Sequence, residues 1–207
     1  MLYPQLKLFC DSLTQQYNSI PDERKIVLQT IAQYIQAKQN NNQKTNLVYI
    51  CTHNSRRSHF GQVWATVAAY YYGIKNIQTF SGGTEVTAFN ANAISALRNQ
   101  GFTIETNNEP IINPHFKVYY TDNLYCKCFS KIYDDDVNPK EYFAAIMTCG
   151  HAETNCPFIP FCELRVSTTY NDPKIADNTA IQEETYYNRS KEIATEQFYL
   201  FSLIQSC

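Results

Sequence analysis

The sequence has no excess of charge of either sign and no broad basic stretch. Of its 207 residues, 17 are Lys or Arg and 19 are Asp or Glu, so the formal net charge is −2 at pH 7. Proteins that bind nucleic acid or an anionic membrane surface usually carry a basic field. We therefore expect no nucleic-acid partner, and we expect any anion to be held by a local site.

Long hydrophobic runs are also missing. No apolar run reaches the ~20 residues that a membrane-spanning helix needs. Residues 1–5 lack the basic and apolar regions of a secretory signal. Both absences predict a cytoplasmic protein without membrane contact. The length is enough for one well-buried domain with a small appendage.

Paired cysteine motifs are absent, although cysteine itself is frequent. The chain has 8 cysteines, at positions 10, 51, 126, 128, 149, 156, 162 and 207. Dense disulfide frameworks belong to shorter secreted chains, so we expect most of these thiols to be reduced. No Cys-x-x-Cys pair offers the usual spacing of a zinc site, so we expect no metal. The side chains that could otherwise hold zinc are Cys126, Cys128, Cys149, His151, Cys156 and Cys162.

The periodicity of apolar residues divides the chain into two parts. Apolar residues recur at helical intervals over residues 2–17 and 21–39, which predicts two helices. The polar tract 36–46 has no periodicity and is predicted to be a linker. We therefore expect an N-terminal helical extension with its linker, residues 1–45, and a main domain, residues 46–207.

The main domain alternates short apolar strands with amphipathic helices. Strands are predicted at residues 47–50, 77–80, 143–147 and 164–168, and helices after Ser58, at 90–100 and at 182–204. This rhythm is typical of a doubly wound α/β fold. We predict a mainly parallel sheet of about four strands flanked by helices.

Residues 113–142 interrupt this rhythm. Short β-like pieces at 116–120 and 128–132 predict a β-hairpin insertion. The acidic run 134–136 is interpreted as a solvated turn, because three consecutive carboxylates point in different directions and do not converge on a divalent ion.

The most informative segment joins the first predicted strand to the helix that follows it. Cys51 ends the strand, Arg57 stands six positions later and Ser58 follows directly. The first turn of a helix offers unpaired amide N–H groups and a positive dipole end, which bind an anion and favour a thiolate. We therefore interpret Cys51 as a nucleophile. The predicted oxyanion-binding loop consists of Thr52, His53, Asn54, Ser55, Arg56, Arg57 and Ser58.

A buried structural cysteine before an ordinary turn is the alternative reading of Cys51. A structural turn has no need of two adjacent arginines with an asparagine and two serines, so we favour the nucleophile.

A cysteine that attacks a phosphoryl group cannot protonate the departing oxygen, so an acid is needed elsewhere. Asp172 follows the strand predicted at 164–168 and should lie at the same sheet edge as Cys51. A plain Asp-Pro turn is the alternative. Cys149 and Cys156 follow the strand predicted at 143–147. They could relay a disulfide if Cys51 reduced its substrate, or they could be structural thiols.

Residues 51–58 resemble the phosphate loop of low-molecular-weight protein tyrosine phosphatases and of the thioredoxin-coupled arsenate reductases that share their fold. The loop reads Cys51-Thr52-His53-Asn54-Ser55-Arg56-Arg57-Ser58. Residues 80–85 and 90–101 are similar to the second strand of that family and its following helix. Residues 149–157 are similar to the redox segment of the reductases, and Asp172-Pro173 to the acid of the family.

The resemblance covers most of residues 46–204 and implies a role for each matching residue. Cys51 would be the nucleophile and Arg57 would bind the oxyanion bidentately. Ser58 would stabilise the thiolate, Asn54 would brace the loop and Asp172 would be the general acid. His53 stands where the family usually has glycine and should narrow the anion pocket.

In the reductase branch of the family, Cys51 would attack arsenate and Cys149 would attack the resulting adduct to release arsenite. Cys156 would close a disulfide that thioredoxin reduces. Phosphatases of this fold generally lack this second thiol pair, so its presence favours the reductase.

The resemblance therefore implies an arsenate reductase with no bound cofactor and with thioredoxin as its external reductant. Its implied partners are arsenate, phosphate or phosphotyrosine, and thioredoxin. A phosphatase acting on phosphotyrosine through Cys51, Arg57 and Asp172 is the second expectation, and a non-catalytic phosphate-binding module is the third. The N-terminal helices are interpreted as an element for packing or for forming a homodimer.

Overall fold

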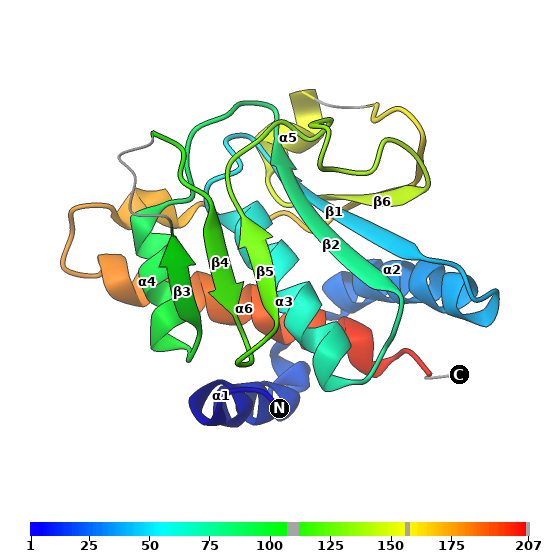
Figure 1. Cartoon of the computed structure of the whole chain (residues 1–207), viewed down its shortest axis with the longest axis horizontal. Coiled ribbons are helices and arrows are strands. Elements are labelled where there is room, and N and C mark those ends of the chain that lie inside the picture. Colours follow the sequence, from blue (N-terminus) through cyan, green and yellow to red (C-terminus); the bar gives the residue numbers. More distant parts are fainter. Residues whose placement is uncertain (107–111, 156–157, 206–207) are drawn as a thin grey trace.

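The computed structural model describes residues 1–106, 112–155 and 158–205. A four-stranded sheet in the order β2-β1-β6-β7 forms its centre (Figure 1). The strands are β1 (Thr45–Cys51), β2 (Ile77–Gly83), β6 (Phe143–Met147) and β7 (Cys162–Ser167). Neighbouring strands all pair in parallel, which confirms the predicted α/β sheet.

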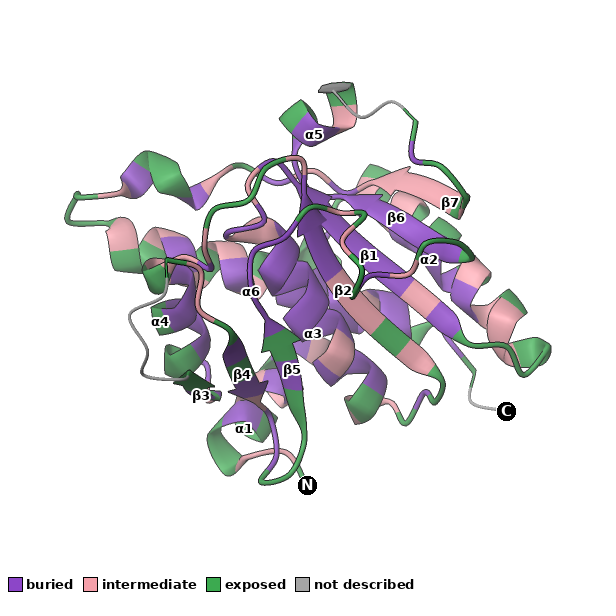
Figure 2. Ribbon diagram, turned by 45° about the horizontal axis from the view of Figure 1, so that its top comes forward, coloured by how far each residue is buried: buried purple, intermediate pink, exposed green. Residues whose placement is uncertain are grey.

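The two middle strands are apolar along almost their whole length. Every residue of β6 is buried, and so is every residue of β1 except Asn46 (Figure 2). Uninterrupted apolar strands are typical of a parallel sheet that is covered on both faces. This continuity explains why both strands could be recognised in the sequence.

Helices cover one face of the sheet in two layers. α2 (Asp22–Asn40) and α3 (Arg57–Tyr71) lie against the strands, and α6 (Gln182–Ser202) lies against both of these helices. α1 (Pro4–Thr14) and α4 (Ala91–Asn99) pack on α6 in turn. On the other face, the short helix α5 (Gly150–Asn155) contacts β1 and β6. Two short 3-10 helices, η1 (Tyr17–Ser19) and η2 (Pro173–Ala176), complete the helices of the described residues.

The N-terminal helices share the core of the main domain. Leu6 of α1 and Ile31 of α2 are fully buried in the same hydrophobic cluster as Trp64 of α3 and Phe198 of α6. The helix predicted over residues 21–39 is confirmed by α2, and the predicted linker over residues 36–46 shortens to residues 41–44, because α2 continues to Asn40 and β1 begins at Thr45. The tract lacks apolar periodicity, but its Gln, Ala and Lys residues are good helix formers.

The predicted insertion forms part of a second, antiparallel sheet. Its strands are β3 (Thr103–Thr106), β4 (Phe116–Tyr119) and β5 (Tyr125–Cys128), in that order. A hairpin of β4 and β5 is therefore present, but its second strand lies at 125–128 and not at 128–132, where we predicted it. Alternation of exposed and buried residues in β5 is the pattern of a half-buried strand. β3 has only four residues, which explains why its sequence did not reveal it.

Residues 129–132 leave β5 and run to the end of β2. Ile132 forms a parallel bridge with Gly83, and the Gly83 N–H donates to the Lys131 carbonyl at 2.9 Å. This segment therefore reaches the same edge of the parallel sheet as Cys51. Among the described residues, no helix is both long and apolar enough to cross a membrane.

Candidate functional site

The residues singled out in the sequence gather at one edge of the parallel sheet. Cys51 is the last residue of β1, and the segments that follow β6 and β7 run beside it. Thr148 donates its N–H to the Ile50 carbonyl at 2.7 Å, and Tyr170 donates to the Thr148 carbonyl at 3.2 Å. These bonds carry the chain toward Cys149 and Asp172, so both lie at the edge where Cys51 ends its strand.

The Cys51 thiol is almost completely enclosed, with 3% of the residue exposed. Its Sγ lies 3.1 Å from Ser58 Oγ. Ser58 Oγ also accepts a hydrogen bond from Asn54 Nδ2 at 2.9 Å, and Asn54 Oδ1 accepts the Lys131 backbone N–H at 2.9 Å. A backbone N–H can only donate, so the Asn54 amide has one orientation. The Ser58 hydroxyl, which accepts from Asn54, keeps its own proton for the sulfur.

This chain of hydrogen bonds has a chemical consequence. A hydrogen bond donated to a negatively charged atom stabilises that charge, so the Ser58 hydroxyl is placed to stabilise the Cys51 sulfur when the sulfur acts as a nucleophile. Asn54 also sits at φ 42°, in the left-handed region that asparagine tolerates better than most residues. The loop therefore turns at Asn54, and the side chain of that residue fixes the hydroxyl beside the nucleophile.

The carbonyl oxygens of the loop are held from the outside. Residues 84–90 and Ser130 donate hydrogen bonds of 2.8 to 3.2 Å to the carbonyl groups of Cys51, Thr52, His53 and Ser55. Gly83 packs so closely that an added Cβ would lie 2.6 Å from the Thr52 carbonyl oxygen. Only glycine fits at that position without displacing the loop.

The amide groups of the loop have the opposite environment. Within the described part of the chain, no N–H group of residues 52–56 donates a hydrogen bond to the protein. With the carbonyl groups turned to outside partners, these free donors at the start of α3 form a cradle for an anion. The arrangement can hold a tetrahedral oxyanion beside the Cys51 sulfur.

Arg57 begins α3 and pairs with the segment that carries the candidate acid. Its terminal nitrogens donate to the Tyr170 carbonyl at 2.9 Å and to Asp172 Oδ2 at 2.7 Å. Its Nε is buried and has no partner among the described residues. An unpaired buried donor costs free energy that an incoming acceptor would recover. Bidentate binding of an oxyanion by Arg57 stays a prediction.

Asp172 is partly exposed and lies between the loop and η2. Its Oδ1 accepts the Lys174 N–H at 3.0 Å, which caps η2, and its Oδ2 pairs with Arg57. The capping bond fixes the carboxyl group at the mouth of the loop. The role of Asp172 as general acid stays a prediction.

Three of the predicted loop residues pair with groups other than the Cys51 sulfur. Arg56 Nε donates to the Tyr186 hydroxyl at 2.9 Å, which ties the loop to α6. His53 lies at the rim, where its Nε2 is 3.4 Å from Glu85 Oε2. The Ser55 hydroxyl donates to the Ala88 carbonyl at 2.7 Å and so supports the loop from outside. Arg56, His53 and Ser55 therefore anchor the cradle.

Cys149 is a second buried thiol beside the loop. Its Sγ lies 3.4 Å from Thr52 Oγ1 and accepts the Ala152 N–H at 3.4 Å. Cys51 and Cys149 belong to one hydrophobic cluster. Thr52 Oγ1 also lies 3.2 Å from His151 Nδ1, a contact that the sequence did not suggest. Cys156, the proposed third thiol, lies outside the described residues.

Two further observations concern groups near the site. No three His, Cys, Asp or Glu side chains in the described ranges gather as metal ligands would. His59 follows Ser58 in sequence, but it is fully buried and its Nδ1 lies 3.2 Å from Ser81 Oγ. Burial, together with the nearby Lys131 charge, lowers the pKa of His59 to about 3. The ring is therefore neutral at physiological pH and is no general acid.

The known proteins that resemble this chain include arsenate reductases. No family model matches the chain. An arsenate reductase of Bacillus licheniformis is 24% identical over 159 residues, which cover 77% of this chain and 96% of that protein. An arsenate reductase of Bacillus subtilis is 24% identical over 146 residues, which cover 70% and 86%.

Solved structures share the fold at lower sequence identity. A YwlE mutant from Bacillus subtilis is 12% identical with a TM-score of 0.52, and the match covers 77% of this chain and 98% of that one. An arsenate reductase from Archaeoglobus fulgidus is 18% identical with a TM-score of 0.51, covering 75% and 98%. At these identities the two structures establish a common fold.

Proposed function

We propose that the chain is a member of the superfamily of low-molecular-weight protein tyrosine phosphatases and the arsenate reductases that share their fold, and that it reduces arsenate with Cys51 as nucleophile. Either branch is a cysteine-based enzyme that acts on a phosphate-like oxyanion. The observation that carries the proposal is the pair of buried thiols at one loop. Cys51 ends β1, and Cys149 lies 3.4 Å from the hydroxyl of the next residue, Thr52.

The proposed reaction begins in the amide cradle. The loop N–H groups and Arg57 bind arsenate, and Cys51 Sγ attacks the arsenic atom. One arsenate oxygen leaves as water after it takes up protons, and Asp172 is the proposed donor. A covalent bond then joins Cys51 Sγ to pentavalent arsenic.

Reduction follows by thiol exchange. The Cys149 thiolate attacks Cys51 Sγ, a disulfide forms, and the sulfur–arsenic bond breaks. The electron pair of that bond stays on arsenic, which leaves as trivalent arsenite. Cys156 then attacks Cys149 and frees Cys51, and thioredoxin reduces the Cys149–Cys156 disulfide while it is oxidised itself.

Two contacts support Cys149 as the second thiol. The Ala152 N–H donates to Cys149 Sγ at 3.4 Å and fixes the position of the sulfur. Cys149 Sγ also lies 3.4 Å from the hydroxyl of Thr52, the residue after Cys51. Both contacts support a relay through Cys149.

The test is arsenate-dependent oxidation of NADPH in the presence of thioredoxin and thioredoxin reductase. Cys51→Ser should abolish turnover, and Cys149→Ser or Cys156→Ser should lower it by at least ~100-fold. Cys162→Ser is the matched control. Cys162 is the first residue of β7 and lies at the end of the strands opposite to Cys51, so it should not take part in the reaction. Full turnover in both relay variants would exclude the relay.

A phosphatase is the second candidate, and the Arg57–Asp172 pair beside Cys51 favours it. These three residues supply the nucleophile, the oxyanion ligand and the acid that ester hydrolysis needs. Rapid hydrolysis of p-nitrophenyl phosphate that survives Cys149→Ser would identify this activity, with phosphotyrosine as the expected substrate class. Phosphate binding without turnover in either assay would leave the non-catalytic binding module.

A further inference from the structure

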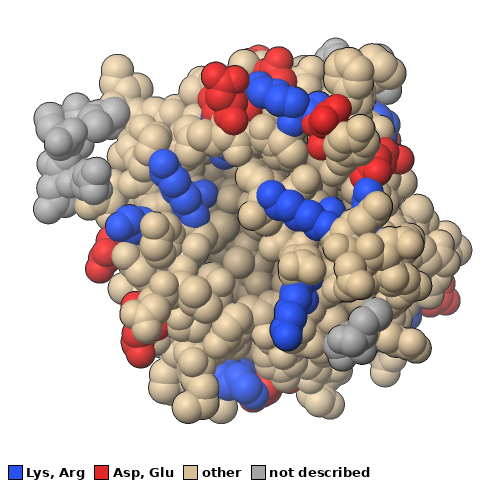
Figure 3. Space-filling model, turned by 45° about the vertical axis from the view of Figure 1, so that its right-hand side comes forward, with Lys and Arg blue, Asp and Glu red and all other residues tan. Residues whose placement is uncertain are grey.

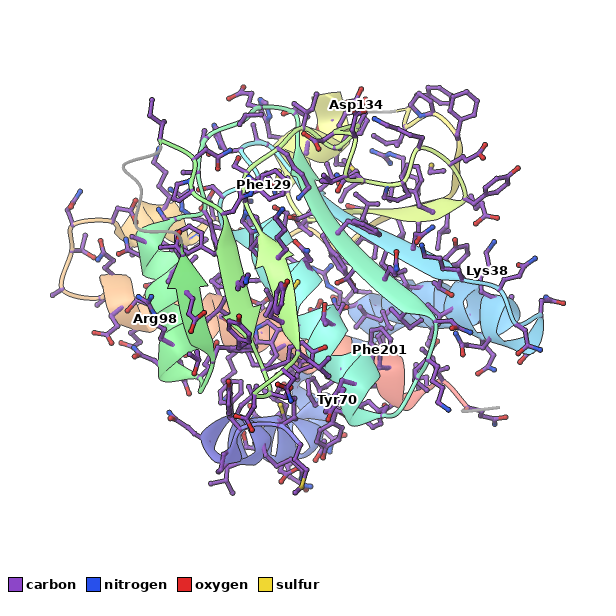
Figure 4. The ribbon with its side chains drawn as sticks, in the orientation of Figure 1. Lys38, Tyr70, Arg98, Phe129, Asp134 and Phe201 are labelled. Atoms are coloured by element: carbon purple, nitrogen blue, oxygen red, sulfur yellow. The ribbon has the colours of Figure 1, made fainter. Side chains whose placement is uncertain are left out.

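A cavity lies between β2, α3 and β5. Its volume is about 510 Å³, and none of its lining residues belongs to residues 51–58 or to the segments of Cys149 and Asp172. Figure 4 labels Phe129 and Tyr70, which lie toward the two ends of the space between β2 and β5. The volume falls within the range of small-molecule sites.

Lys131 lines this cavity and forms no close ion pair with a described carboxylate. Only 4% of the residue is exposed, and its Nζ lies 4.4 Å from the centroid of the Phe129 ring. Asp135 and the thiols of Cys126 and Cys128 lie near enough to act on its charge, but no carboxylate of the described residues pairs with it directly. Burial lowers the pKa of Lys131 below its ordinary value. A buried cation without a directly bonded counter-charge is costly, and an anion in the cavity would offset that cost.

The rest of the lining points to the same kind of ligand. Lys127 supplies a second cation, whose Nζ lies 5.4 Å from the Phe129 ring. No Asp or Glu is among the described lining residues, whereas Tyr70, Tyr120 and Phe129 provide aromatic faces. Figure 3 shows this side of the molecule with a hollow that has basic side chains around it. The cavity therefore combines positive charge with flat apolar walls.

We propose that this cavity binds a small organic anion with a flat, apolar body. Its acidic group pairs with Lys131 and Lys127, and its body packs against Phe129 and the two tyrosines. The Cys51 loop takes a compact tetrahedral anion, so the two sites select different ligands. This second site does not depend on the reaction proposed for Cys51.

The probes that test the proposal are 2-naphthoate and its neutral counterpart 2-naphthamide, titrated into the full chain by calorimetry. Naphthoate should bind at least ~10-fold more tightly than naphthamide, which corresponds to about 1.4 kcal/mol. Saturating inorganic phosphate, which fills the Cys51 loop, should leave naphthoate binding unchanged. Cys51→Ser should bind both probes as the native chain does.

The variants locate the charge. Lys131→Met should bind naphthoate and naphthamide with about equal affinity. Lys127→Met should keep part of the native preference for naphthoate. Lys127 is exposed, so its variant folds even if the buried substitution does not. Lys25→Met removes a charge from α2 and is the matched control, with no expected effect. Equal affinity for both probes, an unchanged preference in Lys131→Met and Lys127→Met, or displacement by phosphate would overturn the proposal.

Discussion

Replacing Ser58 with alanine removes the group that donates to the nucleophile and leaves the rest of the loop in place. Ser58 is fully buried, its Oγ lies 3.1 Å from Cys51 Sγ, and it receives the Asn54 amide at 2.9 Å. The substitution therefore has two consequences. The sulfur loses its hydrogen-bond donor, and Asn54 Nδ2 loses its acceptor.

The magnitudes follow from these two bonds. A hydrogen bond to a charged group contributes about 1.5–3 kcal/mol, so the thiolate should be disfavoured by roughly 10- to 150-fold. The unpaired Asn54 donor should destabilise the fold by about 1–3 kcal/mol. For a chain of this size, each kcal/mol lowers Tm by about 2–4 °C.

The assay is alkylation by iodoacetamide at pH 7, followed by mass spectrometry of the peptide that contains Cys51. Ser58→Ala should react at least ~10-fold more slowly than the native chain, because the thiolate is the reacting form. Ser55→Ala is the matched control. It removes a serine from the same loop and breaks a hydrogen bond to the Ala88 carbonyl, but it does not remove a donor to the sulfur.

A result within twofold of the native rate would refute the reasoning, provided that thermal unfolding shows Ser58→Ala to be folded. It would mean that the Ser58 hydroxyl does not stabilise the thiolate and that the loop amides alone do so. Equal slowing in Ser55→Ala would be a second contradiction, because the effect would then belong to loop order and not to the hydroxyl.

Further predictions concern the supports of the site. Burial raises the pKa of Glu196 from 4.5 to about 7, so the folded state holds this proton more tightly. The resulting stability is complete below about pH 4.5 and is lost as pH rises through 7. Denaturant titrations at pH 5 and pH 8 measure the free energy of unfolding. Between these two pH values, that free energy should fall by up to roughly 3 kcal/mol more in the native chain than in Glu196→Gln. Gly83→Ala should distort the loop and cost about 1–3 kcal/mol with loss of turnover. A Cβ added at Gly150 meets no atom within 4 Å, so Gly150→Ala should unfold at the same denaturant concentration as the native chain. Arg24→Met removes the 2.7 Å bond to the Thr169 carbonyl, three residues before Asp172, and should lower kcat more than it changes KM in steady-state assays.

Local patterns in the sequence were sufficient for much of the fold. The strand β6 has the predicted bounds, Phe143–Met147, because its apolar run is continuous and is bounded by polar residues. The helix after Ser58 was predicted from apolar periodicity, and α3 covers it. The position of Cys51 between a buried strand and a helix could also be predicted, because strand, turn and helix are adjacent in the chain.

Elements that depend on distant partners were missed or misplaced. β3 is stabilised by its antiparallel pairing with β4, in which Ile104 lies opposite Val118. Its four residues carry too little pattern to be seen alone. The predicted helix over residues 21–39 and the predicted linker over residues 36–46 overlapped, and the overlap is helical, because the Gln, Ala and Lys residues there have high helix propensity.

By itself, the sequence determined that a cysteine, two arginines and a serine stand on one turn after a buried strand, because those residues are neighbours in the chain. Only the tertiary structure decided how that turn is held. The Lys131 N–H that orients Asn54, the thiol of Cys149 beside Thr52 and the carboxylate of Asp172 on Arg57 come from segments 77 to 115 residues away. Local propensity acts over one or two turns, whereas contacts at such separations form only when the whole core packs.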